Sequence, residues 1–467
     1  MLGGLIRGKR PERAMRRGGW VPAAIAMAWL TASCAPVPRP GTIPVPPSPR
    51  PGPARAQPAA PAPLPIDREP LLDVGLAWDL DSVTVVPARP VAVTGGSGEA
   101  DIVEECSSPI TARLTATAWT ITWIAPDGIA RGVPIAPAET VWVGEREARA
   151  GSRESGPLLG WAGKTWRGRF KIFVNPRGKL TVAARLPLET YLLGVVPGEI
   201  GGLSEELLQA GRAQAIAARS YTLFYRGRRG AEGFDLYGTV EDQVYGPVES
   251  ERPLATRCVH STRGEVALSR GAPIRANYCS TCGGITADAW EAWPTDPLPY
   301  LVSQRDAERN RDHCAQSGTY RWREEWPAEE FLARIASYAP AEGIALPGRG
   351  MGELLDVRVE SRSRSGRVWR LVAETTTGSV VIPAYSIRRV IRRPGNRGQI
   401  LRSNLFKVDV RRDPLTRKAA VVVASGAGSG HGVGLCQTGA LEMARQGLAS
   451  ERILAHYYPG VELKRMY

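Results

Sequence analysis

The fold of this chain is decided by residues 186–226, whose sequence is LPLETYLLGVVPGEIGGLSEELLQAGRAQAIAARSYTLFYR. A short apolar run carries one acid, Glu199, and leads into a long helical pattern. Ser204 is a predicted N-cap with acids directly after it, and basic residues with glycines follow from Arg226 onward, as at a helix end. Small and apolar residues recur between these signals at three- and four-residue steps, so they share one face. We therefore expect a helix over residues 204–226, and its alanine-rich face allows close packing.

Glu199 is the candidate catalytic residue of this stretch. It follows the apolar segment 192–197, and glycines at 198, 201 and 202 leave room beside its carboxyl group. Partial burial of an acid raises its pKa, so that it can donate a proton near neutral pH. The N-terminus of the following helix acts in the opposite direction, because it favours the charged carboxylate. A surface acid or a helix-entry residue is the alternative interpretation.

The composition is that of an ordinary globular protein with a strong positive charge. The chain has 467 residues, of which 43% are hydrophobic and 23% charged, enough for two or three domains. A formal net charge of +14 favours an anionic partner, for which nucleic acid, anionic lipid and an acidic wall polymer all qualify. The arginines are spread along the sequence and are not interleaved with aromatic residues as in single-strand binders. We therefore predict no nucleic-acid partner.

The N-terminus carries an export signal. Basic residues precede an apolar segment, 20–30, that is too short to span a bilayer. Small residues then lead to Cys34 in an order that resembles the processing site of bacterial lipoproteins, with Thr31 where leucine is more usual. Residues 1–34 are therefore predicted to be a signal peptide, with Cys34 as the lipidated first residue of a membrane-anchored protein. An ordinary cleaved signal is the alternative, and both place the protein in the periplasm or cell envelope.

Three further segments follow the signal. Residues 35–70 are rich in proline and poor in large apolar residues, so we predict a disordered linker that favours extended polyproline II and acts as a tether. Residues 71–165 are predicted to form a β-rich subdomain, and residues 166–467 a larger domain built around the central helix. Helices and strands do not alternate regularly, which indicates an α+β fold.

Alternation of apolar and polar residues predicts strands on both sides of the central helix. They fall in residues 71–93 (two strands), 110–124, 133–143, 170–182, 258–268, 274–278, 355–381 (two strands), 406–410 and 419–424. Helical spacing predicts helices in residues 331–338, 435–446 and 450–457, with a short helix or turn in residues 385–391. The strands outnumber the helices, so the α+β fold is expected to be β-rich.

Seven cysteines make metal binding or disulfides an open question. If Cys34 is lipidated, six remain, an even number that allows up to three disulfides in an oxidising compartment. Cys279 and Cys282 have the two-residue spacing of one half of a zinc knuckle, and His313 is adjacent to Cys314. A structural zinc ion on these four residues, a disulfide such as Cys282–Cys314, and free thiols are the three alternatives.

A glycine-rich segment, residues 425–440 (SGAGSGHGVGLCQTGA), overlaps the start of the penultimate predicted helix. A glycine loop before a helix can bind phosphate, but this one lacks the Gly-Lys-Ser/Thr ending of a P-loop. We interpret it as backbone that approaches a ligand or another strand closely, with His431 as its one imidazole. A purely structural turn is the alternative.

Five motifs occur in the order found in one family of exported bacterial wall proteins. They are RGRFKIFVNPRGKLTVAARLPLETYLLGVVPGEI (167–200), AQAIAARSYTL (213–223), EDQVYG (241–246), STRGEVALSRGAPIRANYCSTCGGITADAWEAW (261–293, with PYL at 299–301) and GHGVGLCQTGALEMARQGLASERILAHYYPGVEL (430–463). With these motifs the chain resembles the SpoIID/LytB family, which comprises stage II sporulation protein D and the amidase enhancers. The region before residue 167 matches the family only loosely.

The resemblance implies a function and a catalytic residue. Well-studied family members are lytic transglycosylases that act on peptidoglycan glycan strands stripped of stem peptides, and their acid is the glutamate of the Val-Val-Pro-x-Glu motif, here Glu199. Some members are similar to amidase activators, which implies an amidase partner. Some hold zinc through Cys and His near the Cys-Gly-Gly motif, which implicates Cys282 and the other metal candidates. The chain departs from the family at Ile200, where methionine is common, and in the extra glycines of residues 426–432.

One carboxyl group is sufficient for this reaction. Protonated Glu199 donates to the glycosidic oxygen, and the carboxylate then takes the proton of the muramic acid 6-hydroxyl as that oxygen attacks the anomeric carbon. No water enters, so the paired acids of glycoside hydrolases are not required, and we expect no required cofactor. Amides and aromatic rings suit sugars, and the residues predicted to bind the glycan are Arg219, Tyr221, Asp242, Gln243, Tyr245, His431 and Gln437.

Two other functions are compatible with the same motifs. A lipoprotein that binds peptidoglycan without cleaving it would activate an amidase partner and would not need the acid. A tethering protein would only anchor the wall to the membrane through its lipid. Release of glycan fragments separates both from an enzyme.

Overall fold

The computed structural model describes residues 68–95, 102–115, 118–145, 158–395 and 398–467. Internal contacts divide the chain into Met1–Pro49 and Arg50–Tyr467, and everything described below belongs to the second unit. The predicted signal peptide, Cys34 and nearly all of the proline-rich linker lie outside the described residues. Among the described residues, no helix combines the length and apolar character needed to cross a membrane.

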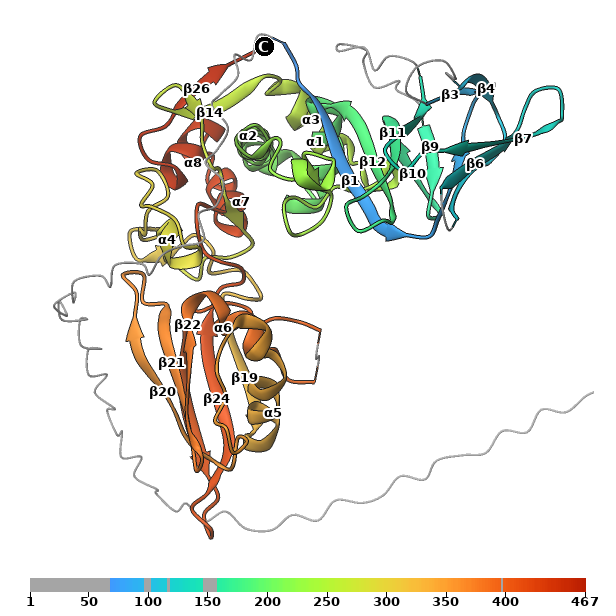
Figure 1. Cartoon of the computed structure of the whole chain (residues 1–467). Coiled ribbons are helices and arrows are strands. Elements are labelled where there is room, and N and C mark those ends of the chain that lie inside the picture. The colour runs from blue at the N-terminus through green and yellow to red at the C-terminus, as the bar shows by residue number, and fades with distance from the viewer. Residues whose placement is uncertain (1–67, 96–101, 116–117, 146–157, 396–397) are drawn as a thin grey trace, which may run out of the picture. The chain divides into compact units, whose positions relative to one another are not determined.

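Two β-sheets form the N-terminal part (Figure 1). The seven-stranded sheet has the order β13-β1-β12-β11-β8-β3-β4, with β1 Leu71–Leu80, β3 Val91–Gly95, β4 Ile102–Cys106, β8 Thr140–Gly144, β11 Arg169–Val174, β12 Leu180–Pro187 and β13 Leu236–Tyr237. The six-stranded sheet has the order β10-β9-β2-β5-β6-β7, with β2 Ser82–Pro87, β5 Ile110–Leu114, β6 Trp119–Ile124, β7 Ala130–Ile135, β9 Leu158–Trp161 and β10 Lys164–Arg167. The predicted strand regions up to residue 182 are confirmed, but residues 71–93 hold three strands because the chain turns a second time before Val91.

The seven-stranded sheet crosses the domain boundary predicted at residue 165. Strand β1 pairs antiparallel with β12 from Leu71↔Pro187 to Leu80↔Leu180, and β8 pairs with β11. Their inward side chains, among them Val74, Val143 and Val182, are fully buried in one common core. Residues 71–165 therefore share a hydrophobic core with the segment that follows.

Helices α1 (Leu188–Ile200) and α2 (Leu208–Tyr225) follow the sheet directly. The apolar run before Glu199, which we did not predict to be helical, forms α1, and Pro197 lies within it. The predicted central helix is confirmed as the 3₁₀ turn η1 (Glu205–Leu207) followed by α2. Ser204 precedes η1 in extended conformation, but its side chain makes no capping hydrogen bond.

The remaining elements of the first core come from two distant parts of the chain. They are η2 Gly230–Glu232, η3 Val248–Ser250, α3 Pro253–Ser261, β14 Glu265–Ser269, β15 Ala272–Pro273, β16 Tyr278–Cys279, α4 Ala289–Ala292, β17 Ala307–Glu308, β18 Arg311–Asp312, β25 Leu435–Cys436, α7 Gln437–Arg445, α8 Ser450–Tyr457 and β26 Glu462–Arg465. The strand predicted at 258–268 is wrong in its first part, because Pro253 starts a helix that continues to Ser261; proline suits the first helical turn, where its missing N–H is not needed. The two C-terminal helices are confirmed, except that residues 435–436 form β25.

A second hydrophobic core is built from residues between β18 and β25 (Figure 1). It contains the antiparallel sheets β19-β24-β23 (Arg321–Pro327, Ala419–Ala427, Phe406–Arg412) and β20-β21-β22 (Leu354–Arg362, Val368–Thr375, Gly378–Pro383), with α5 Ala328–Tyr338, η4 Pro340–Glu342 and α6 Ala384–Val390. The strands and helices predicted here are confirmed, with β22 as an additional strand of its sheet. The fold is thus α+β and rich in strands.

Buried Arg367 and Glu291 join the second core to the first. The Arg367 guanidinium donates to the backbone carbonyls of Cys282 and Ile285, each at 3.1 Å. The Glu291 carboxylate accepts hydrogen bonds from the hydroxyls of Ser363 and Ser365. A charged or hydrogen-bonded group that is buried with its partner is costly to unpair, so these contacts fix the point of attachment.

Candidate active site

Glu199 lies in the last turn of α1, at the point where the chain leaves the helix. Gly201 ends the helix with φ of 79°, a left-handed conformation that favours glycine. The Glu199 side chain is partly exposed, and its Oε1 accepts a hydrogen bond of 2.9 Å from the backbone N–H of Val244. The acid is therefore held in one orientation and still reaches solvent.

Burial raises the pKa of Glu199 above its ordinary value of 4.5. Hydrogen bonding from the Val244 N–H, and then from the side chains of Gln437 and Tyr278, lowers the pKa but does not outweigh burial. We expected a helix N-terminus beside this acid, whereas the structure places it at the C-terminal end of α1, where the helix dipole disfavours a negative charge. The environment thus favours the protonated, proton-donating form.

The Val244 N–H reaches Glu199 because Gly194 has no side chain, so residues 244–246 pack directly against the backbone of α1. The backbone N–H of Gly246 donates to the Gly194 carbonyl at 3.2 Å. A β-carbon at position 194 would lie 2.5 Å from the Gly246 oxygen and 2.7 Å from the Tyr245 ring. Only glycine permits this close approach, and the approach aligns residues 244–246 with the acid.

Tyr278, in strand β16, and Gln437, the first residue of α7, reach Glu199 from segments that are distant in sequence. Strand β16 pairs in parallel with β25, with Tyr278 opposite Leu435, and Gln437 directly follows β25. The Gln437 amide also donates to the side-chain oxygen of Gln214 on α2 at 3.4 Å. The carboxyl group is therefore surrounded by one backbone N–H, one phenol and one amide.

Gln243 positions Tyr278. Its Nε2 donates to the Tyr278 hydroxyl at 2.9 Å, and its Oε1 accepts from the hydroxyls of Thr222 at 2.7 Å and Tyr191 at 3.3 Å. With an exposed fraction of only 1%, Gln243 does not face solvent. Of the predicted glycan-binding residues, Gln243 and Gln437 thus join the hydrogen-bond network around the acid.

His431 also belongs to this neighbourhood. Burial, followed by the positive charges of Arg388, Arg275 and Arg367, lowers the pKa of His431 to about 3, so the imidazole is neutral at neutral pH. Hydrogen bonding to the backbone of Tyr278 acts weakly in the opposite direction. Its Nδ1 accepts from the Val433 N–H at 3.0 Å, and its ring lies 4.7 Å from that of Trp293. The glycine-rich segment therefore brings His431 against the strand that carries Tyr278.

Arg219 is in the protein core and has no access to a glycan. Its exposed fraction is 0%, and its guanidinium makes a two-point ion pair with Glu189 at 2.8 and 2.7 Å. A third nitrogen donates to the Glu265 carbonyl at 3.0 Å. This geometry gives Arg219 a structural role in place of the predicted sugar contact.

Asp242, Tyr245 and Tyr221 are also buried. The Asp242 carboxylate, with 0% of its side chain exposed, pairs with Arg228 and Arg229 at 3.2 and 2.9 Å. The rings of Tyr245 and Tyr191 lie 5.1 Å apart, and those of Tyr221 and Tyr278 lie 6.2 Å apart. These three residues support the site from within the core.

Sequence reasoning missed Tyr278 and the backbone N–H of Val244. Tyr278 stands one residue before Cys279 in the ANYCSTCGG stretch, of which only the cysteines were considered as functional residues. A backbone donor has no side-chain signature, so no pattern could have indicated Val244. The grouping of these two with Glu199 depends on tertiary contacts alone.

The four predicted metal residues do not form one group. Cys282 and Cys314 lie together in a buried cluster with Cys436 and Asp306, whereas His313 belongs to a second group with Asp306 and His456. Cys279 joins no such group among the described residues. No disulfide links the six cysteines of the described part, and the sulfur atoms of Cys282 and Cys314, one of the pairs considered above, are 3.7 Å apart.

Comparison with known proteins identifies two regions of the chain. Residues 176–268 match the family model of SpoIID, described as stage II sporulation protein, and residues 307–434 match a domain of unknown function, DUF8618. The first region contains Glu199, α1 and α2. The second contains the whole of the second core and ends just before β25.

Three relatives match more than half of this chain, and two of them carry assigned names. Stage II sporulation protein D of Bacillus subtilis is 27% identical over 293 residues, which cover 60% of this chain and 74% of the relative. The amidase enhancer of the same organism is 26% identical over 312 residues, covering 58% of this chain and 40% of that protein. An uncharacterized protein of Brachyspira hyodysenteriae is 26% identical over 296 residues, covering 62% and 70%. Residues 176–268 of this chain, with Glu199 at the end of α1, therefore form a domain of the SpoIID family.

Proposed function

We propose that this chain is an exported cell-wall enzyme that cleaves peptidoglycan glycan strands by lytic transglycosylation, with Glu199 as acid and base. The observation that carries the proposal is the state of this one side chain: partly exposed, oriented by the Val244 N–H and raised in pKa by burial. Such an acid is protonated over a wider pH range than a free glutamate and can donate to a leaving oxygen. The relatives named stage II sporulation protein D and amidase enhancer support a role in processing peptidoglycan.

The proposed reaction uses the carboxyl group twice. Glu199 first protonates the glycosidic oxygen and so releases one glycan end. The resulting carboxylate then removes the proton of the muramic acid 6-hydroxyl, whose oxygen bonds to the anomeric carbon and closes a 1,6-anhydro ring. The proton returns to Glu199, so the acid is regenerated without water.

A second carboxylate is not needed for this sequence. Asp242 lies in the same region, residues 176–268, as Glu199. Its side chain is fully buried and paired with Arg228 and Arg229, so it is not free to activate water. Inverting glycosidases need such a base, and retaining ones need a second carboxylate as nucleophile. The commitment of Asp242 to two arginines supports the single-acid route.

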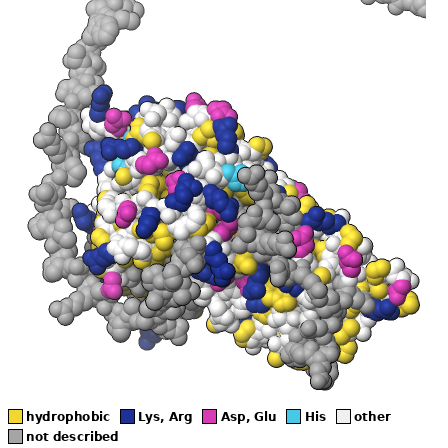
Figure 2. All heavy atoms as spheres, turned by 90° about the horizontal axis from the view of Figure 1, so that it is seen from above, with side chains coloured by type: hydrophobic (Ala, Val, Ile, Leu, Met, Phe, Trp, Pro, Cys, Tyr) yellow, Lys and Arg dark blue, Asp and Glu magenta, His cyan; other side chains and the backbone are white. Residues whose placement is uncertain are grey.

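The net charge of the chain and its predicted export signal are consistent with this function. A net charge of +14 suits glycan strands that carry lactyl carboxylates, and Lys and Arg side chains are distributed with Asp and Glu over the face shown in Figure 2. We place the protein in the periplasm or cell envelope, anchored through a lipid on Cys34. The preferred substrate is glycan from which the stem peptides have been removed.

The test is cleavage of purified glycan strands by the full-length protein. Wild type should release products with 1,6-anhydromuramic ends, detected by mass spectrometry, and Glu199→Gln should lower the rate by about 10²–10⁴-fold, the usual contribution of a general acid. Glu206→Gln removes an exposed acid of η1 and is the matched control, which should keep the wild-type rate. Equal product formation by wild type and Glu199→Gln would show that the acid has no catalytic role.

The relative named amidase enhancer favours one second candidate, a wall-binding protein that stimulates a peptidoglycan amidase. It predicts that the chain releases no glycan fragment by itself. It also predicts that Glu199→Gln stimulates the amidase as strongly as wild type does. The two measurements, made on the same preparations, separate the candidates.

A further inference from the structure

Arg275 is a buried arginine without an acidic partner. It lies between β15 and β16, three residues before Tyr278, and its exposed fraction is 4%. Its Nε donates to the side-chain oxygen of Asn277 at 2.9 Å, and neither terminal nitrogen donates to any group of the described residues. Arginine is charged at every physiological pH, so this side chain holds a positive charge inside the protein with one neutral acceptor.

The other buried arginines of the described part are compensated from within the fold. Arg219 and Arg334 each pair with a glutamate, and Arg367 donates to three backbone carbonyls. A buried charge is costly unless a counter-charge or a set of hydrogen bonds offsets it. Arg275 has neither, and burial lowers its pKa. An anion from outside the chain would supply the missing partner.

Aromatic residues hold the Arg275 guanidinium in place. Its central carbon lies 4.4 Å from the ring centre of Trp293 and 5.8 Å from that of Tyr225. The backbone N–H of Arg275 donates to the Tyr300 hydroxyl at 3.2 Å. A guanidinium that lies over aromatic faces still presents the N–H groups along its edge, and this edge matches a carboxylate.

The guanidinium is open to solvent at its tip. Neither terminal nitrogen of Arg275 belongs to the fully enclosed polar atoms of the described part that have no partner. Trp293 beside it is half-buried. An anionic group can therefore reach the two nitrogens, and the molecule that carries it meets the indole ring.

A row of aromatic rings leads from Arg275 to the acid. The rings of Tyr225 and Tyr221 lie 4.6 Å apart, and those of Tyr221 and Tyr278 lie 6.2 Å apart. Tyr278 is a hydrogen-bond partner of Glu199. The unpaired cation is therefore a neighbour of the candidate active site.

His431 provides a second link between the two. Its ring lies 4.7 Å from that of Trp293, and it hydrogen-bonds to the backbone of Tyr278. The charge of Arg275 is one of those that keep this imidazole neutral. Arg275 and Glu199 thus belong to one continuous region of the protein.

We propose that Arg275 binds the lactyl carboxylate of a muramic acid residue and so selects glycan strands from which the stem peptides have been removed. The inference rests on the proposed function. In intact peptidoglycan the lactyl carboxyl group is joined to the stem peptide as a neutral amide, and removal of the peptide frees an anion. A guanidinium pairs with a carboxylate through two parallel charge-assisted hydrogen bonds, which an amide cannot form. Arg275 therefore distinguishes the two kinds of strand by the charge of one group.

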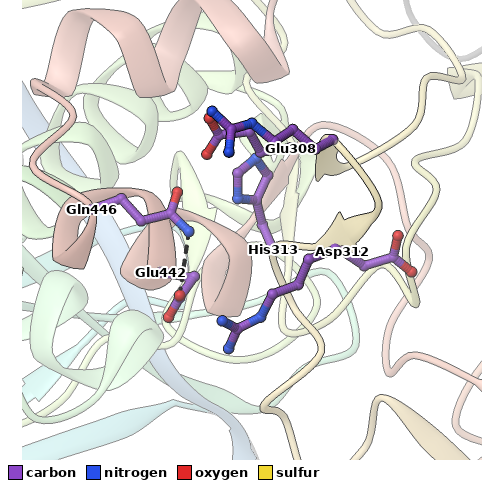
Figure 3. Close-up of a pocket in the computed structure, with 7 residues that line it drawn as sticks. Glu308, Asp312, His313, Glu442 and Gln446 are labelled. Atoms are coloured by element: carbon purple, nitrogen blue, oxygen red, sulfur yellow. Dashed lines mark hydrogen bonds between the residues drawn. The ribbon is translucent and has the colours of Figure 1, made fainter.

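The pocket shown in Figure 3 is less suited to an anion. It has a volume of about 190 Å³, and its two arginines, Arg309 and Arg311, are exposed. Glu308 and Glu442 line the same pocket and offset their positive charge. Arg311 is therefore a matched control for Arg275: it lines a hollow but is neither buried nor unopposed.

The test compares two forms of glycan strand with the full-length protein. One form carries free lactyl carboxylates, and in the other the same carboxylates have been converted to methylamides. Wild type should bind the free form more tightly and cleave it with a lower KM, by about 10- to 100-fold, as expected for a charge-assisted pair. Arg275→Gln should lose this preference through a higher KM for the free form alone, with kcat little changed. Arg275→Lys should keep part of the preference, and Arg311→Gln all of it.

Affinity measured with Glu199→Gln separates this inference from the proposed function. The variant keeps Arg275 and should bind the free form as selectively as wild type does, whether or not Glu199 is catalytic. Equal affinity of wild type for both forms would overturn the inference, and this measurement does not depend on the folding of any variant. An unchanged preference in Arg275→Gln would also overturn it. So would an equal loss of affinity for both forms, because Arg275 would then only maintain the structure.

Discussion

At the scale of the residue, the central observation is a glutamate whose surroundings oppose its charge. Burial and the C-terminal end of α1 both disfavour the Glu199 carboxylate, and the Val244 N–H only partly compensates. A surface acid in a turn would show none of this. The same environment that suits proton donation must therefore reduce the stability of the folded protein when the group ionises.

The dependence of folding stability on the ionisation of Glu199 can be measured with the Glu199→Gln variant. A carboxyl group whose folded pKa is raised contributes stability below its unfolded pKa near 4.5 and loses it as the pH rises through the folded pKa. Glutamine does not ionise, so the Tm of Glu199→Gln minus that of wild type should be larger at pH 7 than at pH 4. Thermal unfolding followed by circular dichroism gives both values, and turnover by wild type should fall over the same rise in pH. A Tm difference that is independent of pH would contradict the raised pKa.

At the scale of the element, the two helices α1 and α2 are joined by a buried ion pair. Glu189 in the first turn of α1 meets Arg219 in α2, and Gly264 and Tyr467 also donate to its carboxylate at 3.2 and 2.6 Å. Burial alone would raise the pKa of Glu189, but the charge and hydrogen bonds of Arg219 outweigh it and lower the pKa. The pair thus ties together the helix that ends in Glu199 and the helix behind it.

Removal of one partner should be strongly destabilising. Arg219→Met leaves the Glu189 carboxylate buried without its cation, and we expect a loss of about 3–5 kcal/mol in the free energy of unfolding, measured with urea. Arg465→Met breaks the exposed pair with Glu265 and should cost less than about 1 kcal/mol. A higher KM with unchanged stability in Arg219→Met would instead support the glycan contact predicted from the sequence.

Gly194 allows a second test of how elements position the acid. In Gly194→Ala the new methyl group meets the Gly246 carbonyl and the Tyr245 ring, so α1 and residues 244–246 must separate. We expect a loss of about 1–3 kcal/mol, as for other overpacked sites, and a lower rate because the Val244 N–H moves away from Glu199. Gly202→Ala adds a methyl group in open space and should change neither quantity. Wild-type stability in Gly194→Ala would show that the contact is not as close as described.

At the scale of the whole molecule, the sequence predicted local structure well and tertiary grouping poorly. Most strands and helices follow from periodicity, and Glu199 was found because its neighbours are apolar and small. Helix α1 was not predicted, because Pro197 and two glycines within it, Gly194 and Gly198, are residues that usually weaken a helix; burial of Leu192, Val195 and Val196 overcomes this preference.

The same limit applies to the candidate site. Arg219 and Asp242 were predicted to contact sugar because of their residue types, but their partners Glu189 and Arg229 lie at separations that no spacing rule reveals. The grouping of Cys436 with Cys282 and Cys314 was not predicted either, because Cys436 stands far from them in the sequence and has no partner in its own motif. Contacts between distant segments decide both outcomes.

The parallel pairing of β16 with β25 has a consequence for the time at which the protein becomes competent. Synthesis proceeds from the N-terminus, so Glu199 and Tyr278 leave the ribosome before the entire second core, and Gln437 leaves only after it. A nascent or truncated chain therefore holds an acid without its full set of partners. The order of the segments therefore means that the site is complete only after the start of α7 has been made.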